Sequence, residues 1–265
     1  MSCVAGRCMV RGYGDGPYDA VMDRWRVDPG TKLDLDKIDP GSTARAPGNK
    51  AKAEKATSEL QDQIATLQER LWAERQQSLL VVLQAIDAGG KDGTVKHVFG
   101  HVNPQGCEVT SFKAPNEDEL AHDFLWRVHS RTPAAGHIGI FNRSHYEDVL
   151  IARVHEVVPK AVWRRRYTDI KAFERTLSTA GTTVVKFFLH ISKDEQARRF
   201  RARLDDPTKC WKFNVDDLKE RALWDDYQRA FEDAITATTT KECPWYVVPA
   251  DHKWYRNWVI SSVLV

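Results

Sequence analysis

An apolar run that ends in a glycine-rich turn constrains the fold of this chain more than any other feature. Residues 79–85 suit a buried strand, the turn Gly89-Gly90-Lys91 follows it, and a helical pattern begins at Thr94. In phosphate-binding loops, backbone N–H groups freed by glycine, a helix N-terminus and one ammonium group converge on an anion. The order of strand, turn and helix therefore predicts such a loop.

The match to the usual loop pattern G-x-x-x-x-G-K-[ST] is imperfect. Ala85 stands in place of the first glycine, and Asp92 stands where Ser or Thr would hold a magnesium ion. An ordinary tight turn is the alternative interpretation of Gly-Gly-Lys. We favour phosphate binding because a strand precedes the turn and a helix follows it. Beside Lys91, the predicted phosphate- or nucleotide-binding residues are Gly89, Gly90, Asp92, Gly93 and Thr94.

Strand and helix patterns alternate along the rest of the chain. Strands are predicted at residues 79–85, 108–113, 137–141, 183–191 and 245–248. Helices are predicted at residues 51–77, 94–101, 117–129, 148–154, 169–179, 216–237 and from 254 to the end. The strand candidates are mainly apolar runs without apolar/polar alternation, which is typical of strands buried on both faces. We therefore expect an α/β fold, a three-layer sandwich around a central parallel five-stranded sheet.

The N-terminal residues differ from this pattern. Residues 1–50 are rich in Gly, Pro and Asp and lack periodicity, so we expect a partly extended arm before a domain at 51–265. The last predicted helix is still apolar at Val265, which indicates that the sequence stops inside an element.

Composition narrows the class of protein. With 39 basic and 37 acidic residues the net charge is only +2, which gives no reason to expect nucleic acid as a partner. No apolar run approaches the roughly 18 to 20 residues that span a membrane, and no secretory signal pattern begins the chain. Five cysteines, with Cys3 and Cys8 lacking a second pair, predict reduced thiols and no zinc site. We expect a cytoplasmic protein without a membrane partner.

A carboxylate inside the predicted loop indicates a metal ion. Asp87 precedes Lys91 by four residues, where a negative charge would repel bound phosphate. The arrangement makes sense if Mg²⁺, or alternatively Mn²⁺, lies between carboxylate and phosphate. An Asx turn that caps the loop is the structural alternative.

A second polar motif follows the strand predicted at 137–141. Because ligands of parallel α/β sheets bind beyond the carboxyl ends of strands, Asn142, Arg143, Glu147 and Asp148 should face the first loop. The guanidinium fork of Arg143 suits phosphoryl oxygens, and Asp148 is a second candidate metal ligand. The alternative is an ion-paired cluster that caps the next helix.

A basic segment follows the strand predicted at 183–191. Arg199 and Arg203 lie four residues apart and repel each other on a helix unless an anion lies against them. Lys209 and Lys212 continue the positive charge. The segment fits a mobile helical lid at about residues 196–222 that brings cations over a phosphate chain. A solvated helix surface is the alternative.

Four motifs together carry a resemblance to a known family. They are Gln-Ala-Ile-Asp-Ala-Gly-Gly-Lys-Asp-Gly-Thr at 84–94, Phe-Asn-Arg-Ser-His-Tyr-Glu-Asp-Val-Leu at 141–150, Lys-Phe-Phe-Leu-His-Ile-Ser-Lys-Asp-Glu-Gln at 186–196 and Trp-Tyr-Val-Val-Pro-Ala-Asp-His-Lys-Trp at 245–254. In this order, from Val27 onward, they closely resemble the polyphosphate kinase 2 family. The resemblance is specific, because ordinary P-loop kinases share only the first motif.

The resemblance implies a P-loop kinase-like fold with a helical lid, and transfer of phosphoryl groups between inorganic polyphosphate and nucleotides. It implies that Asp87 organises magnesium, that Lys91 is the loop lysine, and that Arg143 and Arg203 are the arginines of the second motif and the lid. Asn142 replaces an aspartate of the family's class I, which weakens a direct metal role at this position. Together with Glu147, where class I has asparagine, it resembles class III, whose members phosphorylate both AMP and ADP.

The expected activity is therefore transfer from polyphosphate to AMP or ADP, with adenine nucleotides, or alternatively guanine nucleotides, as acceptors. We also expect a homo-oligomer. Two other functions stay open from the sequence. One is an ATP-dependent nucleotide kinase on the same fold, and the other is a polyanion-binding protein whose loop no longer catalyses transfer.

Overall fold

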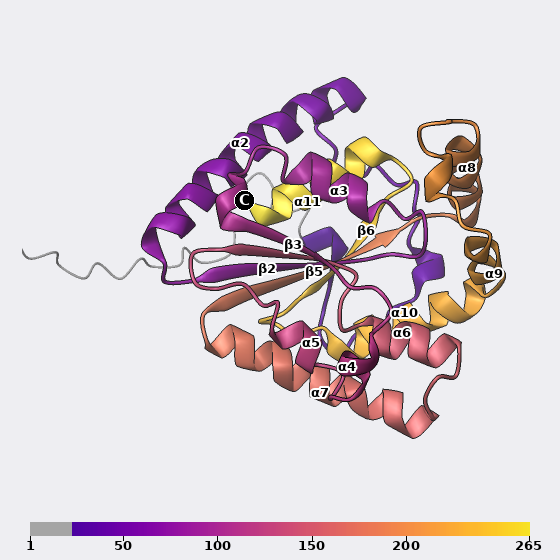
Figure 1. Cartoon of the computed structure of the whole chain (residues 1–265). Helices are drawn as coiled ribbons and strands as arrows, with labels where there is room; N and C mark the ends of the chain where they lie inside the picture. Colours follow the sequence, from indigo (N-terminus) through magenta and orange to yellow (C-terminus); the bar gives the residue numbers. More distant parts are fainter. Residues whose placement is uncertain (1–22) are drawn as a thin grey trace, which may run out of the picture.

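The computed structural model describes residues 23–265, which form a six-stranded sheet between two layers of helices (Figure 1). The strand order in the sheet is β1-β6-β5-β2-β4-β3. The strands are β1 (Arg26–Val27), β2 (Ser78–Gln84), β3 (Cys107–Ser111), β4 (Ile138–Asn142), β5 (Thr182–His190) and β6 (Trp245–Pro249). The predicted three-layer α/β architecture is thus present.

Helices cover both faces of the sheet. One face carries α2 (Lys50–Glu74), α3 (Lys91–Val98) and α11 (Lys253–Leu264). The other carries α4 (Glu117–Leu120), α5 (Trp126–His129), α6 (Glu147–Val154), α7 (Lys160–Thr179) and α10 (Trp224–Thr238). Helices α8 (Lys193–Leu204) and α9 (Asp216–Ala222) lie together at one end of the sheet (Figure 1). Short 3-10 turns are η1 (Leu35–Lys37), η2 (Pro104–Gly106) and η3 (Cys210–Lys212).

The sheet is mixed, which corrects the expectation of five parallel strands alone. The five predicted strands are parallel, but β1 adds an antiparallel edge, with Arg26 opposite Tyr246. A strand of two residues has no periodicity, so the sequence offered no signal for it. Trp25 and Leu35 are also buried, so residues 23–49 pack against the domain. Residues 1–22, with Cys3 and Cys8, lie outside the described part of the predicted arm.

Several predicted helix boundaries were wrong. The helix predicted at 169–179 begins at Lys160, directly after Pro159, where a missing N–H removes no helical bond. The helix predicted at 216–237 divides into α9 and α10 at Leu223, and the one predicted at 117–129 divides into α4 and α5. These breaks fall at ordinary helix-forming residues, so packing rather than local propensity sets them.

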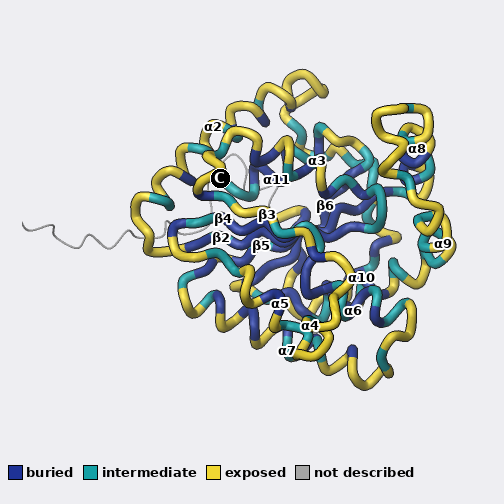
Figure 2. The backbone as a smooth tube through the Cα atoms, in the orientation of Figure 1, coloured by how far each residue is buried: buried dark blue, intermediate teal, exposed yellow. Residues whose placement is uncertain are grey.

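The central strands are buried between the helices (Figure 2), and their side chains belong alternately to two apolar layers. Leu80 and Val82 pack with α6, α7 and α10, whereas Val81 and Leu83 pack with α2, α3 and α11. Both layers are mainly apolar, which explains why the central strands are continuous apolar runs in the sequence. In residues 23–265 no helix is long and apolar enough to cross a membrane.

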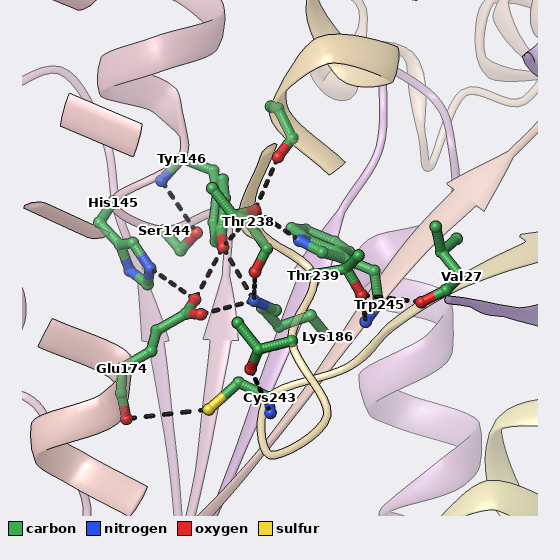
Figure 3. Close-up of polar contacts among 12 residues, drawn as sticks. Val27, Ser144, His145, Tyr146, Glu174, Lys186, Thr238, Thr239, Cys243 and Trp245 are labelled. Carbon is green, nitrogen blue, oxygen red and sulfur yellow. Dashed lines mark hydrogen bonds and ion pairs between the residues drawn. The ribbon is translucent and has the colours of Figure 1, made fainter. Parts of the chain in front are cut away.

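A polar cluster interrupts the apolar layer between the sheet and α7 (Figure 3). Lys186 on β5 donates hydrogen bonds to Glu174 at 2.5 Å and to the Thr238 carbonyl at 2.9 Å. Tyr146 donates to the other Glu174 oxygen at 2.7 Å, and His145 lies 3.3 Å from that oxygen. Burial alone raises the pKa of Glu174, but the charge of Lys186 and the contact with His145 lower it below its usual range. The cluster joins β5, α7, α10 and the turn after β4.

We predict that Lys186→Met is strongly destabilising, because it removes the cation that compensates the charge of the buried Glu174 carboxylate. Breaking a buried ion pair typically costs about 3 to 5 kcal/mol in the free energy of unfolding. Urea denaturation of the variant measures the loss. The double variant Lys186→Met/Glu174→Leu removes both charges and should recover part of it. If the double variant loses as much free energy of unfolding as the two single variants added together, the prediction is wrong.

Candidate active site

The loop after β2 presents unpaired N–H groups at the start of α3. Gly90 adopts a left-handed conformation with φ of +102°, which favours glycine, and α3 begins at the next residue. Within the described chain, the N–H groups of Ala88 and of residues 90–93 have no protein acceptor. Such a row of backbone donors at a helix N-terminus binds an anion. Gly89, Gly90, Asp92 and Gly93 line an open groove, as the phosphate prediction requires.

Lys91 lies at the base of this loop. Its ammonium group donates to the Ala85 carbonyl at 2.8 Å, and its side chain is mostly buried. Burial, and then repulsion from Arg143, lower the pKa of Lys91 to about 8, although nearby Asp87 and Glu147 oppose the change. The ammonium group is therefore held by a backbone carbonyl, and its pKa depends on the charge of a ligand bound in the groove.

The second motif faces the loop, as expected. Arg143 Nη2 donates to Asp87 Oδ1 at 2.7 Å, and Asn142 Nδ2 donates to Asp92 Oδ1 at 2.8 Å. Arg143 has a left-handed φ of +65°, which is rare for arginine and turns the chain between β4 and α6. Glu147, at the start of α6, is partly buried beside Asp87 and Arg143, and desolvation raises its pKa.

Asp148 is not part of this arrangement, which corrects the prediction that it is a second metal ligand. Its carboxylate lies 3.6 Å from Arg166 and 3.8 Å from Arg127, and it does not line the groove. Glu147 and Asp148 are neighbours on a helix and project in directions about 100° apart, so only one can face the loop. The alternative of an ion-paired cluster applies to Asp148 alone.

Two further predicted residues donate hydrogen bonds to the carbonyl groups of the loop, and Arg199 also lines the groove. Thr94 is fully buried, and its hydroxyl donates to the Gly90 carbonyl at 3.2 Å. Arg199 is nine-tenths buried, and its guanidinium donates to the carbonyls of Ala88 and Gly89, both at 2.9 Å. Both side chains support the loop from the protein side.

The segment predicted as a lid lines part of the groove. Arg203, Lys209 and Lys212 line it together with the phosphate-binding loop, and its volume is about 1300 Å³. The Lys212 ammonium lies 3.9 Å from Asp92, whereas Lys209 pairs with Asp206 of the lid itself. Arg203 lies 3.4 Å from Asp217 on α9. The lid cations therefore face the loop while each is held close to an acid.

Sequence reasoning missed several groove residues. Asp217 lies close enough to Asp87 that burial, and then the charge of Asp87, raise its pKa. Gln196 and Arg256 contact the back of the loop, and Lys50 and Lys113 extend the positive charge along the groove. No spacing in the sequence relates these residues, because they come from separate elements that meet only in the fold.

The acids of the groove fit a hydrated magnesium ion better than a fully protein-held metal. In the part of the chain that the structure describes, no three His, Cys, Asp or Glu side chains converge as a metal site. Mg²⁺, however, is commonly held by one or two carboxylates together with waters and phosphate oxygens. Asp87 and Asp217 repel each other across the groove, and a divalent cation would relieve that repulsion.

A phosphate-binding loop, a facing arginine and a basic lid over a long groove define an α/β phosphoryl-transfer protein. Residues 48–265 match the family model described as Polyphosphate kinase 2. The chain is 54% identical over 244 residues to the AMP/ADP-polyphosphate phosphotransferase of Meiothermus ruber, covering 92% of this chain and 91% of that protein. The chain belongs to the polyphosphate kinase 2 family.

Two further comparisons agree with this assignment. The ADP-polyphosphate phosphotransferase of Rhodopseudomonas palustris is 44% identical over 257 residues, which cover 91% of this chain and 87% of that protein. The crystal structure of polyphosphate kinase 2 from Arthrobacter aurescens TC1 superimposes with a TM-score of 0.89 at 46% identity, covering 96% of this chain and 89% of that one. The similarity thus includes the fold as well as the motifs.

We predict that kcat/KM for a phosphate donor falls as the pH rises through about 8, where free Lys91 loses its proton. The protonated, cationic form is the one that attracts the anion, so activity is lost on the alkaline side. A bound polyanion raises the pKa of Lys91, so kcat should persist to higher pH than kcat/KM. Initial rates from pH 6.5 to 10 measure both, and a flat kcat/KM profile would contradict the role of Lys91.

Proposed function

We propose that the protein is a polyphosphate:nucleotide phosphotransferase that converts AMP to ADP and ADP to ATP. The observation that carries the proposal is the groove of about 1300 Å³ that runs past the loop and under the lid. Ligand pockets for small molecules typically measure about 300 to 1,000 Å³, so this groove has room for a nucleotide and a phosphate chain together. Its cations extend well beyond the loop, as a linear polyanion requires.

The relatives support this choice of substrates. One is named an AMP/ADP-polyphosphate phosphotransferase and the other an ADP-polyphosphate phosphotransferase. Asn142 and Glu147 favour acceptance of both AMP and ADP, as the resemblance to class III implies. Glu147 lies partly buried beside Arg143, where it can influence how an acceptor phosphate approaches.

Phosphoryl transfer requires mainly that the protein aligns the two substrates and neutralises their negative charge. The nucleophile is already a phosphate oxygen of the nucleotide, so no catalytic base is needed. The free N–H groups of the loop and Lys91 hold the donor, while Arg143 and Arg203 neutralise charge on the transferred group. Mg²⁺, held by Asp87 with Asp217 opposite, would supply further charge neutralisation when bound.

Two other functions use the same geometry. An ATP-dependent nucleotide kinase needs only a short donor site, which leaves the outer cations such as Lys50 and Lys113 unexplained. A binding protein without turnover does not need Asp87, Lys91 and Arg143 to converge on one point. A homo-oligomeric state, the use of guanine nucleotides and a cytoplasmic location stay predictions from the sequence.

The proposal predicts the products from each acceptor. With short-chain polyphosphate as the sole donor and Mg²⁺ present, AMP should give ADP and then ATP, and ADP should give ATP. Chromatography of the nucleotides over time measures this, and omission of polyphosphate is the control. If ADP is phosphorylated while AMP stays unchanged, acceptance of both nucleotides is wrong. If neither nucleotide reacts without ATP, the kinase alternative replaces the proposal.

The lid assignment predicts a change in salt dependence. Arg203 replaces counterions on the donor, so binding should weaken as salt rises, and Arg203→Ala should raise the Michaelis constant for polyphosphate and flatten that dependence. The matched control is Arg201→Ala, because Arg201 is exposed on the same helix and does not line the groove. An exposed charge contributes at most about 1 kcal/mol, so the control should behave like the parent protein. If Arg203→Ala and the parent protein show the same dependence of the Michaelis constant on salt, the segment is a solvated helix surface and not a lid.

A further inference from the structure

We propose that Arg256, on α11, is a positioning residue that fixes the phosphate-binding loop from behind, together with Gln196 and Arg199. The inference rests on the proposed function, because it explains how the loop keeps its donors aimed at a phosphate chain. Arg256 lies outside the four motifs and outside the lid. It is connected to the loop through the fold alone.

The loop carbonyls that could point at phosphate are all turned toward the protein. Gln196 Nε2 donates to the Asp87 carbonyl at 2.9 Å, and Arg199 Nη1 donates to those of Ala88 and Gly89. Arg256 Nη1 donates to the Gly90 carbonyl at 3.2 Å. Four consecutive peptide groups are thus oriented by three side chains. Because a peptide's N–H points away from its C=O, this orientation leaves the N–H groups of Ala88, Gly90 and Lys91 free for the groove, while that of Gly89 donates to the Ile86 carbonyl.

Arg256 is itself held in one geometry. Its side chain is almost fully buried, and Nε and Nη2 donate to Asn257 Oδ1 at 3.1 and 2.7 Å. The third nitrogen, Nη1, then reaches Gly90, where a Cβ atom would lie only 2.3 Å from it. The close approach of guanidinium and backbone therefore depends on glycine at position 90, as well as on its left-handed φ.

The charge of Arg256 lacks an acidic partner. Among residues 23–265, Arg199 pairs with Glu195, but no carboxylate forms an ion pair with Arg256. Burial, and then the nearby charge of Arg199, lower the pKa of Arg256 to about 9. A buried cation without a counterion is costly, and an anion in the groove above it removes part of that cost. Arg256 thus contributes both loop geometry and positive potential to phosphate binding.

The two contributions can be separated with Arg256→Lys and Arg256→Gln. Lysine keeps the charge but cannot bind Asn257 and Gly90 at once, whereas glutamine removes the charge as well. We expect Arg256→Lys to keep the Michaelis constant for polyphosphate within about twofold and to lower kcat on the order of 10- to 100-fold, as loss of a supporting partner does at metal sites. Arg256→Gln should impair both. Asn257→Ala, which frees the guanidinium, should lower kcat in the same direction.

The control is Arg153→Lys, because Arg153 pairs with Asp233 between α6 and α10, away from the loop. It should match the parent in kcat and Michaelis constants, and thermal denaturation shows which variants are folded. If Arg256→Gln does not fold, the kcat values of Arg256→Lys and Asn257→Ala test the positioning role in its place. Folded Arg256→Lys and Asn257→Ala with parental kcat would overturn the positioning role.

Calorimetric titration with tripolyphosphate separates this inference from the proposed function, since it needs no transfer. The parent should bind, and Arg256→Gln should bind at least about tenfold more weakly, which is the loss expected from one charged donor. Equal affinities would overturn the inference even if the parent transfers phosphate. A parent that binds tripolyphosphate but transfers nothing would contradict the proposed function and leave the test of Arg256 valid.

Discussion

A site for polyanions must gather positive charge at one place, and the repulsion among those charges is the constraint on which the rest of this structure depends. Lys91, Arg143, Arg199, Arg203 and Arg256 all lie around one short loop. Most of them are held by an acid or by carbonyl groups, so that each cation is fixed before any ligand arrives. Preorganised charges need no rearrangement when the phosphate binds, which is the main source of electrostatic catalysis.

The parallel sheet makes this concentration of charge possible. Strands β2, β4, β5 and β6 end at the same edge, so the turns that follow them supply the loop, Arg143, the base of α8 and the start of α11. The mainly apolar layers on both faces fix the positions of these turns. The ion pair of Lys186 and Glu174 adds a polar link between the sheet and α7 beneath the second motif. Function is therefore concentrated at one edge, while the two apolar layers provide rigidity.

The sequence predicted those parts of the site that are continuous in the chain. The loop and the facing Arg143 each follow a strand directly, and the lid cations lie on and after the helix that follows β5, so the apolar strand runs located them. The sequence could not predict which side of the loop a residue occupies. Thr94 and Arg199 have the right chemistry for phosphate, but both donate hydrogen bonds to the carbonyl groups of the loop. Asp148 differs from Glu147 by one helical position and joins Arg127 and Arg166 instead.

Contacts between distant elements were invisible in the sequence for a related reason. Asp217, Gln196 and Arg256 act through neighbours in space that no local spacing encodes. The strand β1 was missed because two residues carry no pattern, although its pairing closes one edge of the sheet. The fold class and the reaction type could thus be predicted from short stretches of the sequence. The residues that support the site are brought together only by the tertiary structure.

The anchoring of the lid at both of its ends has an evolutionary consequence. Gln196 and Arg199 fix the first turns of α8 to the loop. At the other end, Arg221 of α9 donates to Gln196, and Tyr227 of α10 donates to Glu220 of α9. The segment between these anchors can change in length at a small entropic cost, because loop closure depends only weakly on loop length. Insertions or deletions there would alter what the groove accepts without disturbing the sheet. New acceptor ranges can therefore arise by changing one exposed segment while the catalytic framework is inherited intact.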